Sequence, residues 1–212
     1  MCNKQEFLKT VSQQVNHFKT NRLFKLIEDK KLILSDYQNM LLMLFHQTFE
    51  GPSTFALAGA HCPNHHWIAR DYLLLHAEEE KSHWQWVIQD LKNIGYTGLD
   101  PRQLFPQTAC QAYIAYNVYC AQKRPLARLA VAAVLETIGG THAKKYALKA
   151  CELLQLKNNQ MTFFLGHSDT DVGHSEDILK IIDQCELNED DWNSMIHAAK
   201  TAGKLYKAMY DE

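Results

Sequence analysis

The sequence predicts an all-α protein, a bundle of about seven helices, on three observations. Apolar residues recur at helical spacing in one segment after another, and no segment alternates convincingly with period two. Short stretches rich in turn residues separate these segments. The chain of 212 residues is long enough to bury a sizeable core. We therefore expect one helical domain over residues 1–212.

The first third of the chain is expected to form two short helices and one long one. The short helices carry apolar residues at helical spacing over residues 7–18 and 21–32. Ser35 is suited to cap the long helix, which begins directly after it. Because proline removes a backbone donor, the glycine–proline pair at 51–52 is expected to disturb this helix, which resumes through residues 54–61.

The rest of the chain continues the helical pattern. Five further helices are expected over residues 67–93, 107–122, 125–154, 158–185 and 190–209. Pro125 suits the first turn of a helix, whereas the glycine pair at 139–140 would loosen or kink the same helix. The last helix opens with acids and carries lysines in its second half, as the helix dipole favours.

Composition excludes several classes of protein. The formal net charge is −2, so the sequence shows no footprint for binding nucleic acid. No apolar run reaches the roughly 20 residues of a membrane span, and the N-terminal stretch lacks the apolar core of a signal peptide. The six cysteines form no Cys-x2-Cys pair, so we expect reduced, buried thiols in a cytoplasmic protein.

Two stretches repeat one pattern of histidines and acids. "HAEEEKSH" runs from His76 to His83, and "HSDTDVGH" runs from His167 to His174. Each places histidine, an acid and histidine at relative positions 0, 4 and 7, which lie at about 0°, 40° and −20° around a helix. Chance predicts about 0.06 such matches over a chain of this composition. The two stretches therefore indicate two helix faces that each carry imidazoles and a carboxylate.

The simpler interpretation of the two stretches is a polar helix face in contact with solvent, and this interpretation suits Glu78 and Glu79. The histidines, however, stand beside apolar runs: His76 follows "YLLL" and His167 follows "MTFFLG". Buried imidazoles need partners, and a metal supplies them. In dinuclear carboxylate bundles, two helices each give an acid with a histidine three residues on. Here the two pairs are Glu80 with His83, and Asp171 with His174.

Such a centre also needs lone carboxylates from other helices. Glu136 is the better candidate, because it is a single acid within the apolar stretch "AVAAVLETIGG". Glu50 is the other, with His46 one turn before it, although a helix-end surface position suits Glu50 equally well. Mixed imidazole and carboxylate ligands suit iron or manganese, and zinc remains open. Two ions about 3.5–4 Å apart would serve either O₂ reduction or hydrolysis.

These stretches resemble the haem-oxygenase-like superfamily, in its branch of di-iron oxidases and oxygenases, often called iron-containing redox enzymes or TenA/THI-4-like proteins. The resemblance rests on "HAEEEKSHWQWVIQDLKNIG", lone Glu136 and "FFLGHSDTDVGHSEDI", and spans roughly residues 21–182. It implies a seven-helix haem-oxygenase-like fold and a metal site. The implied ligands are His83, Glu136, His167, Asp171 and His174.

The sequence departs from this family at one ligand. Several relatives carry a Glu seven residues before the histidine of the first stretch, where this chain has His76. Others use the Glu three residues before it, which is Glu80 here. Either His76 is a ligand in a histidine-rich site, or Glu80 is the ligand and His76 lies close by. We favour Glu80.

The resemblance implies an O₂-activating enzyme that holds two iron ions, or manganese, acts on a small organic molecule, and is often a homodimer. Three alternatives stay open: a metal-free TenA-like enzyme, a pyrroloquinoline-quinone-synthase-like enzyme, and a binding protein without activity. TenA-type thiaminases use a cysteine in the helix that here carries Glu136, and this helix has no cysteine near that place. Haem oxygenases need a histidine near the N-terminus, for which His17 is available.

Overall fold

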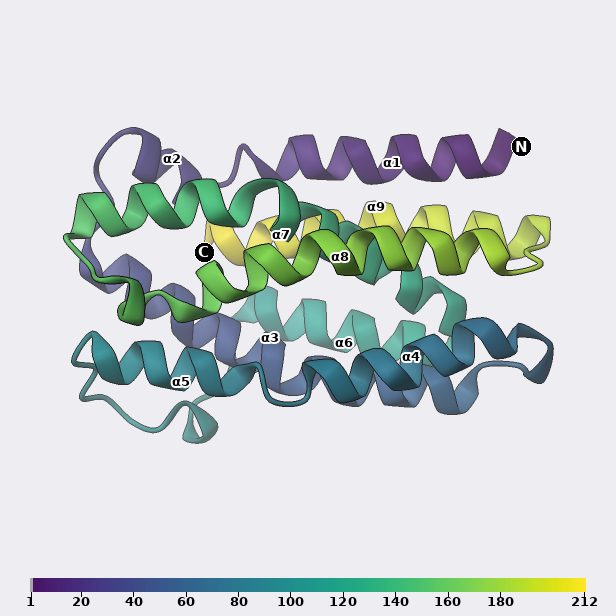
Figure 1. Ribbon diagram of the computed structural model, residues 1–212, viewed down its shortest axis with the longest axis horizontal. Coiled ribbons are helices and arrows are strands. Elements are labelled where there is room, and N and C mark those ends of the chain that lie inside the picture. The colour runs from purple at the N-terminus through teal and green to yellow at the C-terminus, as the bar shows by residue number, and fades with distance from the viewer. Residues whose placement is uncertain (1) are drawn as a thin grey trace.

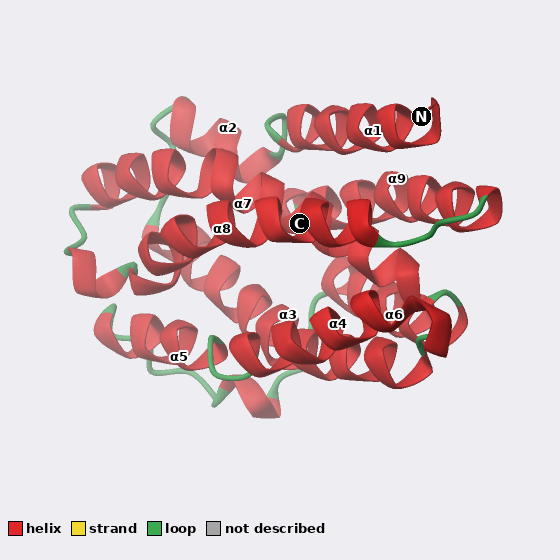
Figure 2. Cartoon of the chain, turned by 45° about the vertical axis from the view of Figure 1, so that its right-hand side comes forward, coloured by secondary structure: helices red, strands yellow, loops and turns green. Residues whose placement is uncertain are grey.

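The computed structural model describes residues 2–212, apart from the side chains of Cys2 and of residues 167–172. Over these residues it contains nine α-helices joined by short loops, and no strand (Figure 2). The expected all-α bundle is confirmed, with nine helices in place of about seven. These are α1 (Cys2–Phe18), α2 (Arg22–Glu28), α3 (Leu34–His61), α4 (Trp67–Glu80), α5 (Trp84–Asn93), α6 (Thr108–Lys123), α7 (Pro125–Leu154), α8 (Thr162–Gln184) and α9 (Glu189–Asp211).

The longest helix, α7, runs through the middle of the bundle (Figure 1). It packs against α8 and α9 and also reaches α1, α3 and α6. On one side of it α1 lies along α9, and on the other α3 packs against α4, α5 and α6. Because helices surround α7, apolar residues cover most of its circumference, and any polar side chain on it is enclosed.

The helix expected over residues 67–93 is in fact two helices, α4 and α5, separated by a turn at residues 81–83. In the turn, the amide of His83 donates to the carbonyl of Glu80, and the amide of Gln85 donates to that of Ser82. The turn contains neither glycine nor proline. The residue types in the turn therefore do not predict the break. The packing of α5 on α3 and α8 overrides the helical periodicity of the sequence.

Because of this break, the three side chains of "HAEEEKSH" do not lie on one continuous helix. His76 and Glu80 lie on α4, but His83 precedes the first turn of α5. The expected stripe of three side chains on one continuous helix is thus wrong for this stretch. The second stretch lies within α8, which is continuous from Thr162 to Gln184.

The expected disturbance at residues 51–52 does not interrupt α3. This helix continues for 28 residues with Pro52 inside it. A proline within a helix removes one backbone hydrogen bond, a loss that a helix packed along its length can carry. Here α3 packs against α4, α5 and α6.

The described cysteines agree with the expectation of reduced thiols, and the described helices agree with the expectation that the chain has no membrane span. Five cysteines are free thiols, four of them buried. Burial raises the pKa of Cys62 to about 11 and that of Cys110 to about 12. In the part of the chain that the structure describes, no helix is both long and apolar enough to cross a membrane.

Candidate metal centre

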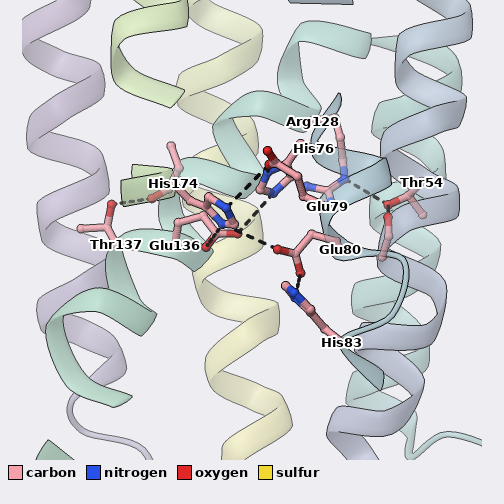
Figure 3. A network of polar contacts seen from close by, with 11 residues as sticks. Thr54, His76, Glu79, Glu80, His83, Arg128, Glu136, Thr137 and His174 are labelled. Atoms are coloured by element: carbon pink, nitrogen blue, oxygen red, sulfur yellow. Dashed lines mark hydrogen bonds and ion pairs between the residues drawn. The ribbon is translucent and has the colours of Figure 1, made fainter. Parts of the chain in front are cut away.

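Three helices bring one ligand-type side chain each to a common point. His76 comes from α4, Glu136 from α7 and His174 from α8 (Figure 3). One donor atom of each lies within 4.8 Å of the others. The closest approaches to the carboxylate are 3.6 Å from Nε2 of His76 and 3.7 Å from Nδ1 of His174.

These side chains are enclosed, and three of their imidazole nitrogens have no hydrogen-bond partner within the described part of the chain. His76 is fully buried, and Glu136 is 6% exposed. Both ring nitrogens of His76, and Nδ1 of His174, are buried without a hydrogen-bond partner among the described residues. A buried polar atom without a partner costs free energy, so these nitrogens indicate a site that could bind a ligand.

The spacing of the donor atoms fits a metal ion. Separations of 3.6–3.7 Å exceed the length of a good hydrogen bond. Two ligand atoms that each bind one ion at about 2.1 Å stand about 3–4 Å apart. Two imidazoles and a carboxylate also suit iron, manganese or zinc. The residues present therefore fit a transition-metal ion.

The charges within this group favour ion binding too. Burial alone would raise the pKa of Glu136, but His174 and His76 outweigh it and hold the pKa below its ordinary value. The Glu136 carboxylate in turn raises the pKa of His174 against the effect of burial. Glu136 is thus a carboxylate at neutral pH, and any proton that His174 carries must leave before this histidine binds a metal.

Three further side chains border the group. The carboxylate of Glu79 lies 3.6 Å from Nδ1 of His76 and 3.7 Å from Nε2 of His174. The carboxylate of Glu80 lies 3.6 Å from Nδ1 of His174 and accepts a hydrogen bond of 2.6 Å from Nδ1 of His83. The turn after α4 makes this last contact possible, and it places a second carboxylate–imidazole pair beside the first group.

Asp90 fixes the position of the helix that carries His174. This fully buried residue of α5 accepts hydrogen bonds from the amides of Thr162 and Phe163, at 2.8 and 2.9 Å, and from the hydroxyl of Thr162. Burial raises the pKa of Asp90, whereas these donors lower it. The carboxylate therefore acts as a helix cap supplied from another helix.

The remaining residues that the sequence nominated lie elsewhere or outside the described side chains. His46 on α3 packs against the ring of Phe45, and burial lowers its pKa. Glu50 is exposed at the rim of a cavity. Neither belongs to the described group of potential ligands. His167 and Asp171 fall among the residues whose side chains the structure does not describe, so their proposed ligation stays a prediction.

A cavity of about 110 Å³ extends from this group along α7. Glu80 and Glu136 line one part of it. Its other walls are mainly apolar and aromatic, with Leu135, Phe163 and Phe164 among them. One water needs only about 10–15 Å³ of such space, so the cavity can take a small organic molecule.

Sequence reasoning missed two residues of this region. Glu79 was assigned to a solvated face, and its side chain is indeed 45% exposed, but its carboxylate reaches both imidazoles. The spacing of three residues from His76 was the available signal. Arg128 is buried in α7 and lines the cavity. It is a lone charge in an apolar run, which is the signal that identified Glu136.

Comparisons with known proteins agree with this architecture. A family model for iron-containing redox enzymes matches residues 43–207. No curated protein matches the chain.

Solved structures show the same fold at low sequence identity. A domain of unknown function with a heme oxygenase-like fold from Shewanella denitrificans is similar at a TM-score of 0.89 and 20% identity, over 98% of this chain and 90% of that one. A TenA homologue from P. horikoshii is similar at a TM-score of 0.79 and 14% identity, over 99% of this chain and 96% of that one. Heme oxygenase-1 from the cyanobacterium Synechocystis, in complex with heme, is similar at a TM-score of 0.73 and 14% identity, over 100% of this chain and 91% of that one. The expected haem-oxygenase-like fold is confirmed.

Proposed function

The chain belongs to the family of iron-containing redox enzymes, and from this premise we propose that it is a non-haem iron oxidase or oxygenase. It uses O₂ on a small organic substrate. The observation that carries the proposal is the buried group of His76, Glu136 and His174. Three of its four imidazole nitrogens lack hydrogen-bond partners among the described residues, and the spacing of its donor atoms suits an ion. Iron is the expected metal, with manganese as the alternative.

A second ion is part of the proposal. Glu80 and His83 stand next to the first group, with the Glu80 carboxylate 3.6 Å from Nδ1 of His174. His167 and Asp171, from the second repeat of the pattern, are proposed to complete the ligands of the pair. His76 and Glu80 then both serve the centre, and they are no longer alternatives.

Bound iron would supply the redox chemistry with O₂ that side chains lack. The protein would place the substrate beside the metal, supply negative charge to hold the metal, and limit the access of water. Glu136 stays ionised in spite of its burial and so holds positive charge at this point. Because Glu80 and Glu136 line the cavity, a substrate inside it lies against the ligands. Apolar side chains such as Phe163 and Phe164 line the same space and limit the access of water.

The structure offers less to the alternatives. His17, the histidine available for a haem oxygenase, is exposed on α1 and does not line the cavity. No cysteine is among the described residues that line it, which disfavours thiaminase chemistry. A metal-free enzyme or a pure binding protein would leave the buried imidazole nitrogens unexplained. A homodimer and a cytoplasmic location remain predictions from the sequence.

Anaerobic titration with ferrous iron tests the proposal directly. The wild-type chain is expected to bind two ions, and both Glu136→Gln and His174→Ala are expected to bind fewer and more weakly. His17→Ala, a change on the exposed face of α1, is the matched control and should titrate as wild type. A wild-type chain that binds neither iron nor manganese would overturn the proposal.

A second measurement identifies the ligands and the alternatives. An anomalous-scattering map from crystals grown with ferrous iron should show metal beside His76, Glu136 and His174. Assays of O₂ consumption with a library of small organic molecules should find turnover in the iron-loaded protein alone. Thiamine hydrolysis by the metal-free chain would favour the TenA-like alternative instead.

A further inference from the structure

Arg128 is a buried cation, and one nitrogen of its guanidinium, Nη1, has no hydrogen-bond partner among the described residues. It lies on α7, and its residue is 2% exposed. Nε donates a hydrogen bond of 3.1 Å to Oγ1 of Thr54 (Figure 3). The guanidinium carbon stands 3.5 Å above the ring of Phe55. The base of the guanidinium and one of its faces are thereby occupied. At its outer end, Nη1 has no such partner.

That outer end forms no ion pair with a described residue, and the carboxylates of Glu136 and Glu80 attract the guanidinium only from a greater distance. Nη1 is buried and has no hydrogen-bond partner among the described residues. No described carboxylate forms an ion pair with the guanidinium, whose polar contact is the one to Thr54. An arginine cannot shed its proton to escape burial. An unpaired buried charge is expensive, so this position calls for an anion.

The unpaired end meets the cavity that reaches the metal centre. Arg128 lines it together with Glu80 and Glu136, and is the one arginine or lysine among the described residues that do so. Asn117 lines it as well: its Nδ2 donates to the carbonyl of Tyr113 at 2.9 Å, and its buried Oδ1 has no partner. Nη1 of Arg128 is therefore left to donate to a ligand, whereas Oδ1 of Asn117 can only accept and forms no hydrogen bond with a carboxylate.

The ring of Phe55 lies between Arg128 and the metal group. Its centroid is 3.5 Å from the guanidinium carbon and 4.4 Å from the ring centroid of His76. The lining of the cavity is largely apolar. A ligand held at Arg128 would thus extend a carbon skeleton toward the acids of the metal centre.

We propose that Arg128 anchors a carboxylate group of the substrate, which makes the substrate a small, otherwise largely apolar carboxylic acid. This inference rests on the proposed function for the identity of the cavity as a substrate site. The fork of a guanidinium matches the two oxygens of a carboxylate. A phosphate dianion would keep a surplus charge in an apolar cavity with one cation, so a monoanion fits better.

Binding of matched probes tests the anchor. Hexanoate and hexanamide share size and shape but differ in charge, and each is titrated calorimetrically into the full chain, once loaded with iron and once after chelation. Hexanoate should bind at least about tenfold more tightly in both states, since a hydrogen bond to a charged group has this weight. Arg128→Met should abolish the preference, and Arg128→Lys should keep part of it.

Controls separate the anchor from folding and from the metal. Arg124→Met removes an exposed arginine that pairs with Asp190 at 3.3 Å, and it should bind hexanoate as wild type does. Should Arg128→Met fail to fold, the Nε resonance of Arg128 in the wild-type chain decides, since hexanoate should shift it and hexanamide should not.

Each other outcome is decisive. Equal binding of the two probes, or an unshifted resonance, overturns the anchor. So does binding of hexanoate that requires iron, because the metal is then its ligand. A chain that binds no iron but keeps the Arg128-dependent preference removes the proposed function and leaves the anchor standing.

Discussion

The two repeats of the histidine–acid pattern have the same spacing but different structures. "HAEEEKSH" is split by the turn between α4 and α5, whereas "HSDTDVGH" lies within continuous α8. In the first, His76 turns into the buried group while His83 pairs with Glu80 in the turn. In the second, His174 enters the buried group from an unbroken helix.

The difference teaches that spacing selects residue types and that tertiary packing decides their geometry. A stripe of positions 0, 4 and 7 exists on a helix that is not interrupted. Once the helix breaks, a residue pair such as Glu80 and His83 can turn toward each other. The two repeats are therefore expected to contribute unequally to metal binding.

The largest effect expected is the contrast between one histidine of each repeat. His174→Ala should weaken ferrous iron binding by at least about 100-fold, more than the loss of an outer partner of a ligand. His83→Ala should weaken iron binding less, because Nδ1 of His83 is already in a hydrogen bond with Glu80. Anaerobic titration against a competing chelator measures both, with circular dichroism as the folding control. Equal losses would show that the repeats are equivalent.

The cap on α8 should matter next. Asp90→Ala removes an acceptor from the amides of Thr162 and Phe163 and should lower the free energy of unfolding by about 1–3 kcal/mol. Asp90→Asn keeps one acceptor oxygen and should cost less. Chemical denaturation gives both values. If Asp90→Ala unfolds at the wild-type midpoint, α8 does not depend on α5 for its start.

The pH dependence of the metal-free chain reports on the second repeat. Because the folded pKa of His174 lies above its ordinary value of 6.5, its stabilising contribution is complete below pH 6.5 and is lost as pH rises through the raised pKa. Because the pKa of Glu136 lies below 4.5, its contribution is present above pH 4.5 and is lost as pH falls through the lowered pKa.

Thermal unfolding after chelation, measured across pH, tests this. The wild-type chain should lose stability on the alkaline side, and His174→Gln should show a flatter profile there. An unchanged profile in the variant would mean that His174 and Glu136 do not interact in the metal-free protein.

The smallest effects concern the glycines of α8. A Cβ at Gly173 meets no atom within 4 Å, so Gly173→Ala should stabilise the chain by up to about 1 kcal/mol. A Cβ at Gly166 would lie 3.3 Å from the ring of Trp86, which offsets most of that gain.

Much of the fold follows from the sequence, for physical reasons. Periodicity of apolar residues predicted the helical class, because burial on one face is what stabilises most helices. The break after Glu80 was not predictable, since no residue there is a helix breaker and packing supplies the cause. The continuity of α3 through Pro52 was missed for the converse reason, because tertiary contacts sustain a helix that its sequence weakens.

The candidate site also contains residues that the sequence could identify and residues that only the packing of the helices brings together. Glu136 could be identified because a lone acid in an apolar run must find a cation, and the same argument applies to Arg128. The role of Glu79 could not be read from the sequence, since a half-exposed acid looks like any surface carboxylate until the imidazoles are placed beside it. Which side chains meet depends on how three helices cross, and no local pattern contains that.

The hydrogen bonds from α8 to Asp90 have a consequence for how the molecule opens. They join α5 to residues that lie 72 and 73 positions further along the chain. If the first turn of α8 frayed alone, it would abandon a buried carboxylate, so the two segments should open as one cooperative unit. Their amide protons are then expected to exchange with solvent at a common rate, and any ion held by α8 would slow exchange in α5 as well.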